Sequence, residues 1–275
     1  MPSSSTLGLL WGSVVHRPYV YAFLACFIAF AVHHLGFRRM LLFLVPTYFV
    51  AYACEYSSTR NGFPFGPYRY FDDTRGRELW ISNIPFFDSL SFVFLSYFSF
   101  VIAAALLGDV SRPVSRAIPW LGGVLMMLLD VVIDPVALQG DKWFLGRIYD
   151  YPYRGFYFGV TAANFAGWFF VGLVTQALFR FLLGAFAWSR APLRPVGRFF
   201  VLGSYGVYAG IFLFNLTMTV IIGDGQLALA SGIVTAGTLA AIAAHLARSP
   251  SRSRIAREAR ISREDREREG GEALK

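Results

Sequence analysis

The stretch PYVYAFLACFIAFAVHHL, residues 18–35, decides the fold class of this chain. It contains no Asp, Glu, Lys or Arg, and a helix of about 20 mostly apolar residues is long enough to cross the hydrocarbon core of a bilayer. Six further apolar stretches follow, at residues 40–56, 84–107, 117–134, 160–182, 199–222 and 227–247. The sequence therefore predicts an all-α, polytopic integral membrane bundle of about seven transmembrane helices.

The composition of the chain agrees with this fold class. Of its 275 residues, 56% are hydrophobic and 17% aromatic, and the mean hydropathy is +0.50. The net charge of +8 could indicate a nucleic-acid partner, but nine of the 25 basic residues lie beyond residue 247. We therefore predict no nucleic-acid partner, a transmembrane domain over residues 1–247, and a charged tail over residues 248–275 that is disordered or forms a surface helix.

Basic residues near the apolar stretches predict the orientation of the chain. Arg190, Arg194 and Arg198 lie in one loop, and the tail is richer still, whereas the loop around Asp224 has no basic residue. Basic residues favour the cytoplasmic side of a membrane. We therefore expect a cytoplasmic C-terminus, in a bacterial inner membrane, although the loop after the second stretch is also basic.

Polar side chains lie at corresponding ends of the apolar stretches. Glu55 ends the second stretch, Asp130 and Asp134 end the fourth, and Asn164 and Trp168 begin the fifth. Because successive spans run in opposite directions, all these ends lie on the same side of the membrane. An ionisable group in a membrane helix is costly and normally faces the bundle interior. The sequence therefore predicts a site that contains Glu55, Asp130 and Asp134.

The spacing of Asp130 and Asp134 has a chemical consequence. Residues four apart lie on one face of a helix, and two like charges in a low dielectric disfavour each other. We therefore expect one of the two to hold a proton near neutral pH and to be able to act as a general acid. For Asp134 an alternative is equally open: it caps the helix before Pro135, or pairs with a loop arginine such as Arg69 or Arg147.

Two aromatic loops follow the same ends of these stretches. Residues 62–71 read GFPFGPYRYF, and residues 143–159 read WFLGRIYDYPYRGFYFG. Gly and Pro favour turns, and aromatic side chains favour the membrane boundary. The two loops together predict a lid over an elongated apolar cavity. For the first loop taken alone, an aromatic belt with a tight turn is the simpler interpretation.

The sequence lacks the motifs of several cofactor-dependent enzymes. It contains no HxxxH, HExxH or DDxxD pattern, and no glycine-rich phosphate loop, dinucleotide fingerprint or nucleophile elbow. These absences disfavour a di-metal lipid desaturase, a magnesium-dependent prenyltransferase and nucleotide-driven chemistry. We therefore predict no metal and no organic cofactor.

Several of these motifs, taken together, resemble those of a known family. They are Glu55 followed by GFPFGPY, then Asp130, Asp134 and Pro135, then YFGV at residues 157–160 with Asn164 and Trp168. In their order and spacing, over residues 40–180, they resemble the carotenoid biosynthesis protein family, which contains CruF-type carotenoid hydratases and bisanhydrobacterioruberin hydratase. The stretch after Pro85 departs from the pattern of that family.

The resemblance implies an enzyme that adds water across the terminal carbon–carbon double bond of an acyclic carotenoid and yields a tertiary alcohol. Water would be the co-substrate. Asp134 or Asp130 would donate the proton, and Glu55 would orient water or balance charge. The implied substrate contacts are Phe63, Phe65, Tyr68, Arg69, Tyr70, Tyr157, Asn164 and Trp168. Tyr68, Tyr157 and Trp168 would face the cation, and Arg69 and Asn164 would hold the acids and water by hydrogen bonds.

Other functions fit part of the pattern. A carotenoid end-group cyclase also begins with protonation of an alkene but excludes water. A transporter would use the three acids as an ion relay, yet the last two stretches offer few polar residues to continue it. A carotenoid-binding protein without catalysis would not need the acids. The expected partners are an acyclic carotenoid, membrane lipid and other enzymes of the carotenoid pathway.

Overall fold

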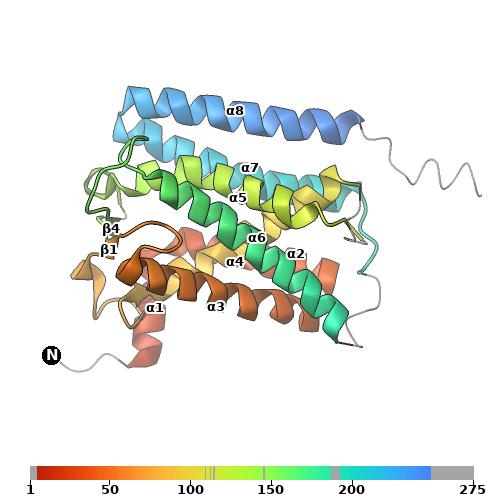
Figure 1. The fold of residues 1–275 in the computed structure, drawn as a ribbon, viewed down its shortest axis with the longest axis horizontal. Coiled ribbons are helices and arrows are strands. Elements are labelled where there is room, and N and C mark those ends of the chain that lie inside the picture. The colour runs from red at the N-terminus through yellow and green to blue at the C-terminus, as the bar shows by residue number, and fades with distance from the viewer. Residues whose placement is uncertain are drawn as a thin grey trace, which may run out of the picture.

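The computed structural model describes residues 5–248, except positions 109, 112, 114, 145 and 187–192. A short helix, α1 (Thr6–His16), precedes seven helices that are long and apolar enough to cross a membrane. These are α2 (Pro18–Leu35), α3 (Phe37–Asn61), α4 (Phe86–Leu106), α5 (Ile118–Ala137), α6 (Ala162–Ala185), α7 (Arg198–Ile222) and α8 (Gly225–Arg248). The long helices lie side by side in a bundle (Figure 1). They confirm the predicted fold class; Arg190 and residues 249–275 lie outside the described residues.

Two of the predicted boundaries require correction. The second helix begins at Phe37 and continues to Asn61, so Glu55 lies inside it and not at its end. The fourth helix continues through Pro135 to Ala137. Asp134 therefore does not cap a helix that stops before the proline, which removes one of the alternatives for this residue.

Helix α4 is the centre of the bundle because its sequence is apolar on every face. It packs against α2, α3, α5 and α7, and nearly all of its residues from Phe87 to Ala104 are buried. A helix that is hydrophobic all round is a buried helix. Most polar side chains on α4 therefore lie inside the protein, whereas Asp88 in its first turn and Ser91 are half-buried.

Helices α5 and α6 approach each other closely at glycines. A Cβ atom on Gly123 would lie 2.8 Å from the carbonyl oxygen of Phe169, and one on Gly172 would lie 3.0 Å from Cα of Gly123. Small residues allow such close contact between membrane helices. The contact fixes the height of Asp130 and Asp134 on α5 relative to Asn164 on α6.

The loops at one end of the bundle contain short secondary structure. The loop between α3 and α4 holds β1 (Arg69–Tyr70), a 3-10 turn (Asp72–Thr74), β2 (Trp80–Ile81) and β3 (Ile84–Pro85). The loop between α5 and α6 holds a second 3-10 turn (Gly140–Lys142) and β4 (Tyr149–Asp150). β2 pairs with β3, and β1 pairs with β4 in antiparallel register. The two long loops are thereby joined at one end of the bundle (Figure 1).

A buried ion pair fastens the start of α2 to the first of these loops. Arg17 Nη2 lies 3.3 Å from Glu78 Oε1, and both side chains are buried. The Arg17 guanidinium also lies 4.4 Å from the ring centroid of Phe87. The first turn of α4, with Asp88, is therefore held against the start of α2.

Candidate active site

A first acid group joins Glu55, inside α3, to the start of α4. The Tyr70 hydroxyl lies 3.1 Å from Glu55 Oε1 and also contacts Asp88 Oδ2. Ser89 donates its hydroxyl to the other oxygen of Glu55. A phenol has only one O–H, so both Tyr70 contacts are hydrogen bonds only when one of the two carboxyl groups carries a proton. In that state the proton is shared among Glu55, Asp88 and Tyr70.

A second acid group lies where α5 meets the start of α6. The amide nitrogen of Asn164 donates to Asp130 Oδ2 and to Asp134 Oδ2, each at 2.7 Å. The Tyr151 hydroxyl donates to Asp134 Oδ2 at 3.2 Å. The two carboxyl groups lie on one helix face, as predicted, and neutral donors hold them. Arg147, offered above as a partner of Asp134, instead lies 3.7 Å from Asp141.

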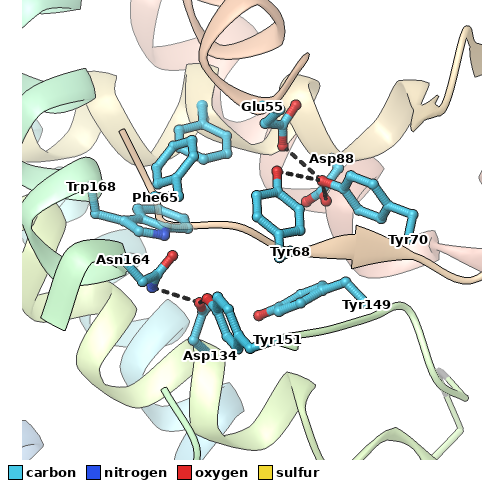
Figure 2. Close-up of a pocket in the computed structure, with 11 residues that line it drawn as sticks. Glu55, Phe65, Tyr68, Tyr70, Asp88, Asp134, Tyr149, Tyr151, Asn164 and Trp168 are labelled. Carbon is cyan, nitrogen blue, oxygen red and sulfur yellow. Dashed lines mark hydrogen bonds between the residues drawn. The ribbon is translucent and has the colours of Figure 1, made fainter. Parts of the chain in front are cut away.

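Four tyrosines connect the two acid groups. In β1 and β4, Tyr70 is opposite Tyr149, and the Tyr68 ring lies 5.3 Å from Tyr70 and 5.8 Å from Tyr149, centroid to centroid. Tyr149 and Tyr151 are 5.9 Å apart. Figure 2 shows Tyr68 and Tyr149 between Glu55 and Asp134, with Tyr70 beside Asp88 and Tyr151 beside Asp134. We call Tyr68, Tyr70, Tyr149 and Tyr151 the tyrosine cluster.

The tyrosine cluster consists of neutral hydroxyls. Burial raises the pKa of all four hydroxyls well above the ordinary value of about 10, and the neighbouring carboxyl groups raise the pKa further when they are ionised. The hydroxyls therefore stay protonated at neutral pH and can donate hydrogen bonds to the acids or to a water molecule.

An acid cavity lies between the two groups. It has about 310 Å³ of empty space, including the open space at its mouth, and its polar wall is formed by Glu55, Asp88, Asp134, Asn164 and the tyrosine cluster. The remaining wall is aromatic: Phe92 stacks on Trp168 with ring centroids 4.4 Å apart, and Phe65 lies 5.7 Å from Phe92. One cavity thus presents carboxyl groups, phenols and π faces to the same space (Figure 2).

Most of the residues that the sequence predicts for the site do meet at this cavity. Its lining includes Glu55, Phe65, Tyr68, Tyr70, Asp134, Asn164 and Trp168. Asp130 does not line the cavity and is linked to Asp134, which does, through the shared amide of Asn164. Oδ1 of Asp130 is buried and has no hydrogen-bond partner among the described residues.

The structure does not bring Phe63, Arg69 or Tyr157 into the lining. The Phe63 side chain is 59% exposed and packs on Phe170, and Tyr157 packs on Phe165. Arg69 is exposed, because successive side chains of a strand point to opposite faces. With Tyr68 and Tyr70 facing the cavity, Arg69 must face away, so it does not hold the acids as expected.

Sequence reasoning missed Asp88, Phe92, Tyr149 and Tyr151, all of which line the cavity. Asp88 could have been found, because the start of the stretch 84–107 lies on the same side of the membrane as the end of the stretch before it. The alternation in YRY at 68–70 and YDY at 149–151 was a signal for two short strands with tyrosines on one face. The sequence shows the four tyrosines, but it does not show that the strands that hold them pair with each other.

Gly167 on α6 sets the position of Phe65 in the cavity wall. A Cβ atom there would lie 2.4 Å from Phe65 Cδ1 and 3.0 Å from Phe65 Cα. We expect Gly167→Ala to lower the free energy of unfolding by about 1–3 kcal/mol, as overpacked sites do. Gly184→Ala in the same helix is the matched control, because nothing lies within 4 Å of its Cβ position. Thermal unfolding in detergent measures both; equal melting temperatures would contradict this packing.

The described part of the chain holds no cluster of three His, Cys, Asp or Glu side chains that could bind a metal ion. The acids instead contact hydroxyl and amide groups. Carboxyl groups held in this way can donate and accept protons. The chemistry that the arrangement offers is therefore acid–base chemistry beside an aromatic surface.

Comparison with known proteins shows the family of this chain. The family described as carotenoid biosynthesis protein matches residues 16–239, which include both acid groups and the tyrosine cluster. Bisanhydrobacterioruberin hydratase of Haloarcula japonica is 31% identical over 158 residues, which are 57% of this chain and 48% of that protein. The match thus spans about half the length of that curated relative. No solved structure matches the chain. The chain belongs to the carotenoid biosynthesis protein family.

Proposed function

We propose that the protein is a membrane-bound carotenoid hydratase that adds water across the terminal double bond of an acyclic carotenoid end group by acid catalysis. The observation that carries the proposal is the acid cavity, in which two hydrogen-bonded acid groups face one space beside the stacked rings of Phe92 and Trp168. Membership of the family and the similarity to a hydratase support the choice of substrate.

The first step is protonation of the alkene. A trisubstituted double bond is a weak base, so its protonation needs a positioned acid and a stabilised product. Asp134 lines the cavity and gives its proton to the less substituted carbon, which leaves a tertiary cation on the other carbon. The π faces of Trp168 and Phe92 and the nearby carboxylates stabilise this cation.

The second step is capture of the cation by water. The oxygen of water forms a bond to the tertiary carbon and loses one proton to the carboxylate group formed by Glu55 and Asp88. Tyr70, which contacts both, fixes their geometry. In sum, one alkene and one water molecule give one tertiary alcohol. The proton gained by the first acid group returns to Asp134 through hydroxyls of the tyrosine cluster or through water.

Asp130 and Asn164 serve this chemistry indirectly. Asn164 bridges the carboxyl groups of Asp130 and Asp134, so it fixes the orientation of Asp134. Asp130 does not line the cavity and acts as a positioning residue. The proposal needs no metal or organic cofactor, because carboxyl groups supply both acid and base, and water is the co-substrate.

Hydration is favoured over cyclisation by the polar half of the cavity. A cyclase must keep water away from its cation, whereas here the hydroxyl of Tyr70, the carboxyl group of Glu55 and the amide of Asn164 border the space in which the cation would form. Groups of this kind hold water.

Expression in cells that make lycopene tests the proposal. The extracted pigments should gain the mass of water at one or both ends, measured by mass spectrometry. An isomer of unchanged mass would show cyclisation instead. If lycopene and other acyclic carotenoids all remained unchanged, the proposal of an enzyme would be overturned. The remaining functions would then be a transporter or a carotenoid-binding protein.

We also propose that the protein lies in a bacterial inner membrane with its C-terminus in the cytoplasm, among membrane lipid and other enzymes of the carotenoid pathway. The support is the arginine-rich end of the chain after α8 and the preference of basic residues for the cytoplasmic side. A C-terminal tag should be inaccessible to protease in intact spheroplasts; cleavage there would reverse the orientation.

A further inference from the structure

A second and larger cavity adjoins the acid cavity. It encloses about 710 Å³ of empty space, including its open mouth, and lies among α2, α4, α5 and α7 and the loop before β4. Four residues line both cavities: Asp88, Asp134, Tyr149 and Trp168. We call the second space the chain cavity and these four residues the junction.

The surface of the chain cavity is mostly apolar. Its inner wall is formed by the buried side chains of Phe94, Leu95 and Ile211. Two of its polar residues are satisfied by their own helices: Asn215 donates to the Ile211 carbonyl at 2.9 Å, and Ser91 donates to the Asp88 carbonyl at 2.7 Å. A ligand in this cavity would therefore meet mostly apolar surface before it reaches the junction.

The outer wall of the chain cavity is a seam between α2 and α7. Tyr19 of α2 stacks on Phe214 of α7 with ring centroids 5.3 Å apart, and Phe23 meets the same ring edge-on at 6.5 Å. All three line the cavity and are only half-buried, whereas the residues of the inner wall are buried. The seam is therefore the more exposed wall of the cavity, and aromatic side chains form much of it.

We propose that the chain cavity binds the hydrocarbon chain of a linear isoprenoid substrate, which passes between α2 and α7 and ends with its terminal double bond at the junction. This inference rests on the proposed hydratase function. The occupant is a long apolar chain because the lining is mostly apolar, the seam is half-exposed, and Asp88 and Asp134 at the junction are the acids among the lining residues.

Two reactants then approach the junction from different sides. Hydrocarbon fills the chain cavity, and water occupies the acid cavity, where Glu55, Tyr70 and Asn164 can hold it. Among Glu55, Asp88, Asp130 and Asp134, only Asp88 and Asp134 line both spaces. The reacting carbon atoms therefore meet Asp88 and Asp134 directly, Glu55 acts on the water, and Asp130 acts from behind Asp134.

A matched pair of substitutions on α7 tests the assignment. Ile211 lines the chain cavity and is 3% exposed, whereas Leu213 is 51% exposed and is absent from the lining. Both variants are made in an Asp134→Asn background, which blocks turnover, and are purified from lycopene-producing cells. Bound lycopene per protein, measured by absorbance, should be about tenfold lower for Ile211→Phe than for Leu213→Phe, because added volume competes with the chain.

Equal lycopene retention by the two variants would overturn the inference, as would release of phospholipid rather than pigment from the Leu213→Phe protein. If Ile211→Phe fails to elute as a folded protein in gel filtration, Ile133→Phe takes its place, because Ile133 lines the same cavity at a half-buried position. Wild-type protein that retains lycopene without hydrating it would overturn the proposed function alone.

Discussion

Asp134→Asn should lower the rate of carotenoid hydration by about 10²–10⁴-fold, the range typical of a lost general acid. The amide keeps the shape of the carboxyl group, so the contacts with Asn164 and Tyr151 change little in geometry. It has no proton that it can give to an alkene. The rate is measured as hydrated pigment formed per protein in isolated membranes.

The control for Asp134→Asn is Asp150→Asn. Asp150 lies on β4 between Tyr149 and Tyr151 and does not line either cavity. It should therefore retain conversion close to that of the wild type. Normal conversion by Asp134→Asn, with the protein present in the membrane at its usual level, would remove Asp134 as the proton donor.

Asp88→Asn should lower the rate by about 10²-fold or more, because Asp88 lines both cavities and belongs to the group that accepts the proton of water. The matched control is Asp72→Asn, since Asp72 is exposed and pairs with Arg75 at 2.8 Å outside the cavity. Single-turnover assays on lycopene in membranes compare the two variants.

A double variant tests whether Glu55 and Asp88 act together. Glu55 and Asp88 contact one hydroxyl, that of Tyr70, and residues that act as a unit have non-additive effects. The double variant Glu55→Gln with Asp88→Asn should thus be little slower than either single variant. Losses that multiply would show that the two carboxyl groups act independently.

The helices of this protein were predictable because the requirement for a membrane span is local. In hydrocarbon every backbone N–H and C=O must be satisfied within the protein, which a helix achieves from its own segment. Length and apolar composition alone therefore located all seven helices. The same logic of alternating spans placed Glu55, Asp134 and Asn164 on one side, and the structure brings all three to one cavity.

The exact ends of the helices were harder to predict from the sequence. α5 continues past Pro135 to Ala137, although the residue before a proline is biased away from helix. Packing against α4 and α6 outweighs this local preference. The consequence is functional, because Asp134 lies inside a helix that fixes its direction and not at a fraying end.

The sequence by itself determined a seven-helix membrane bundle and a cluster of acids on one side of it. Only the tertiary structure decided which loop side chains face that cluster: it placed Tyr70 and Tyr149 inside, Arg69 outside, and Asp88 between two cavities. The physical reason is that these positions depend on the pairing of β1 with β4 and on the packing of α4 among its neighbours. Both contacts join segments far apart in the chain, and no local pattern encodes their register.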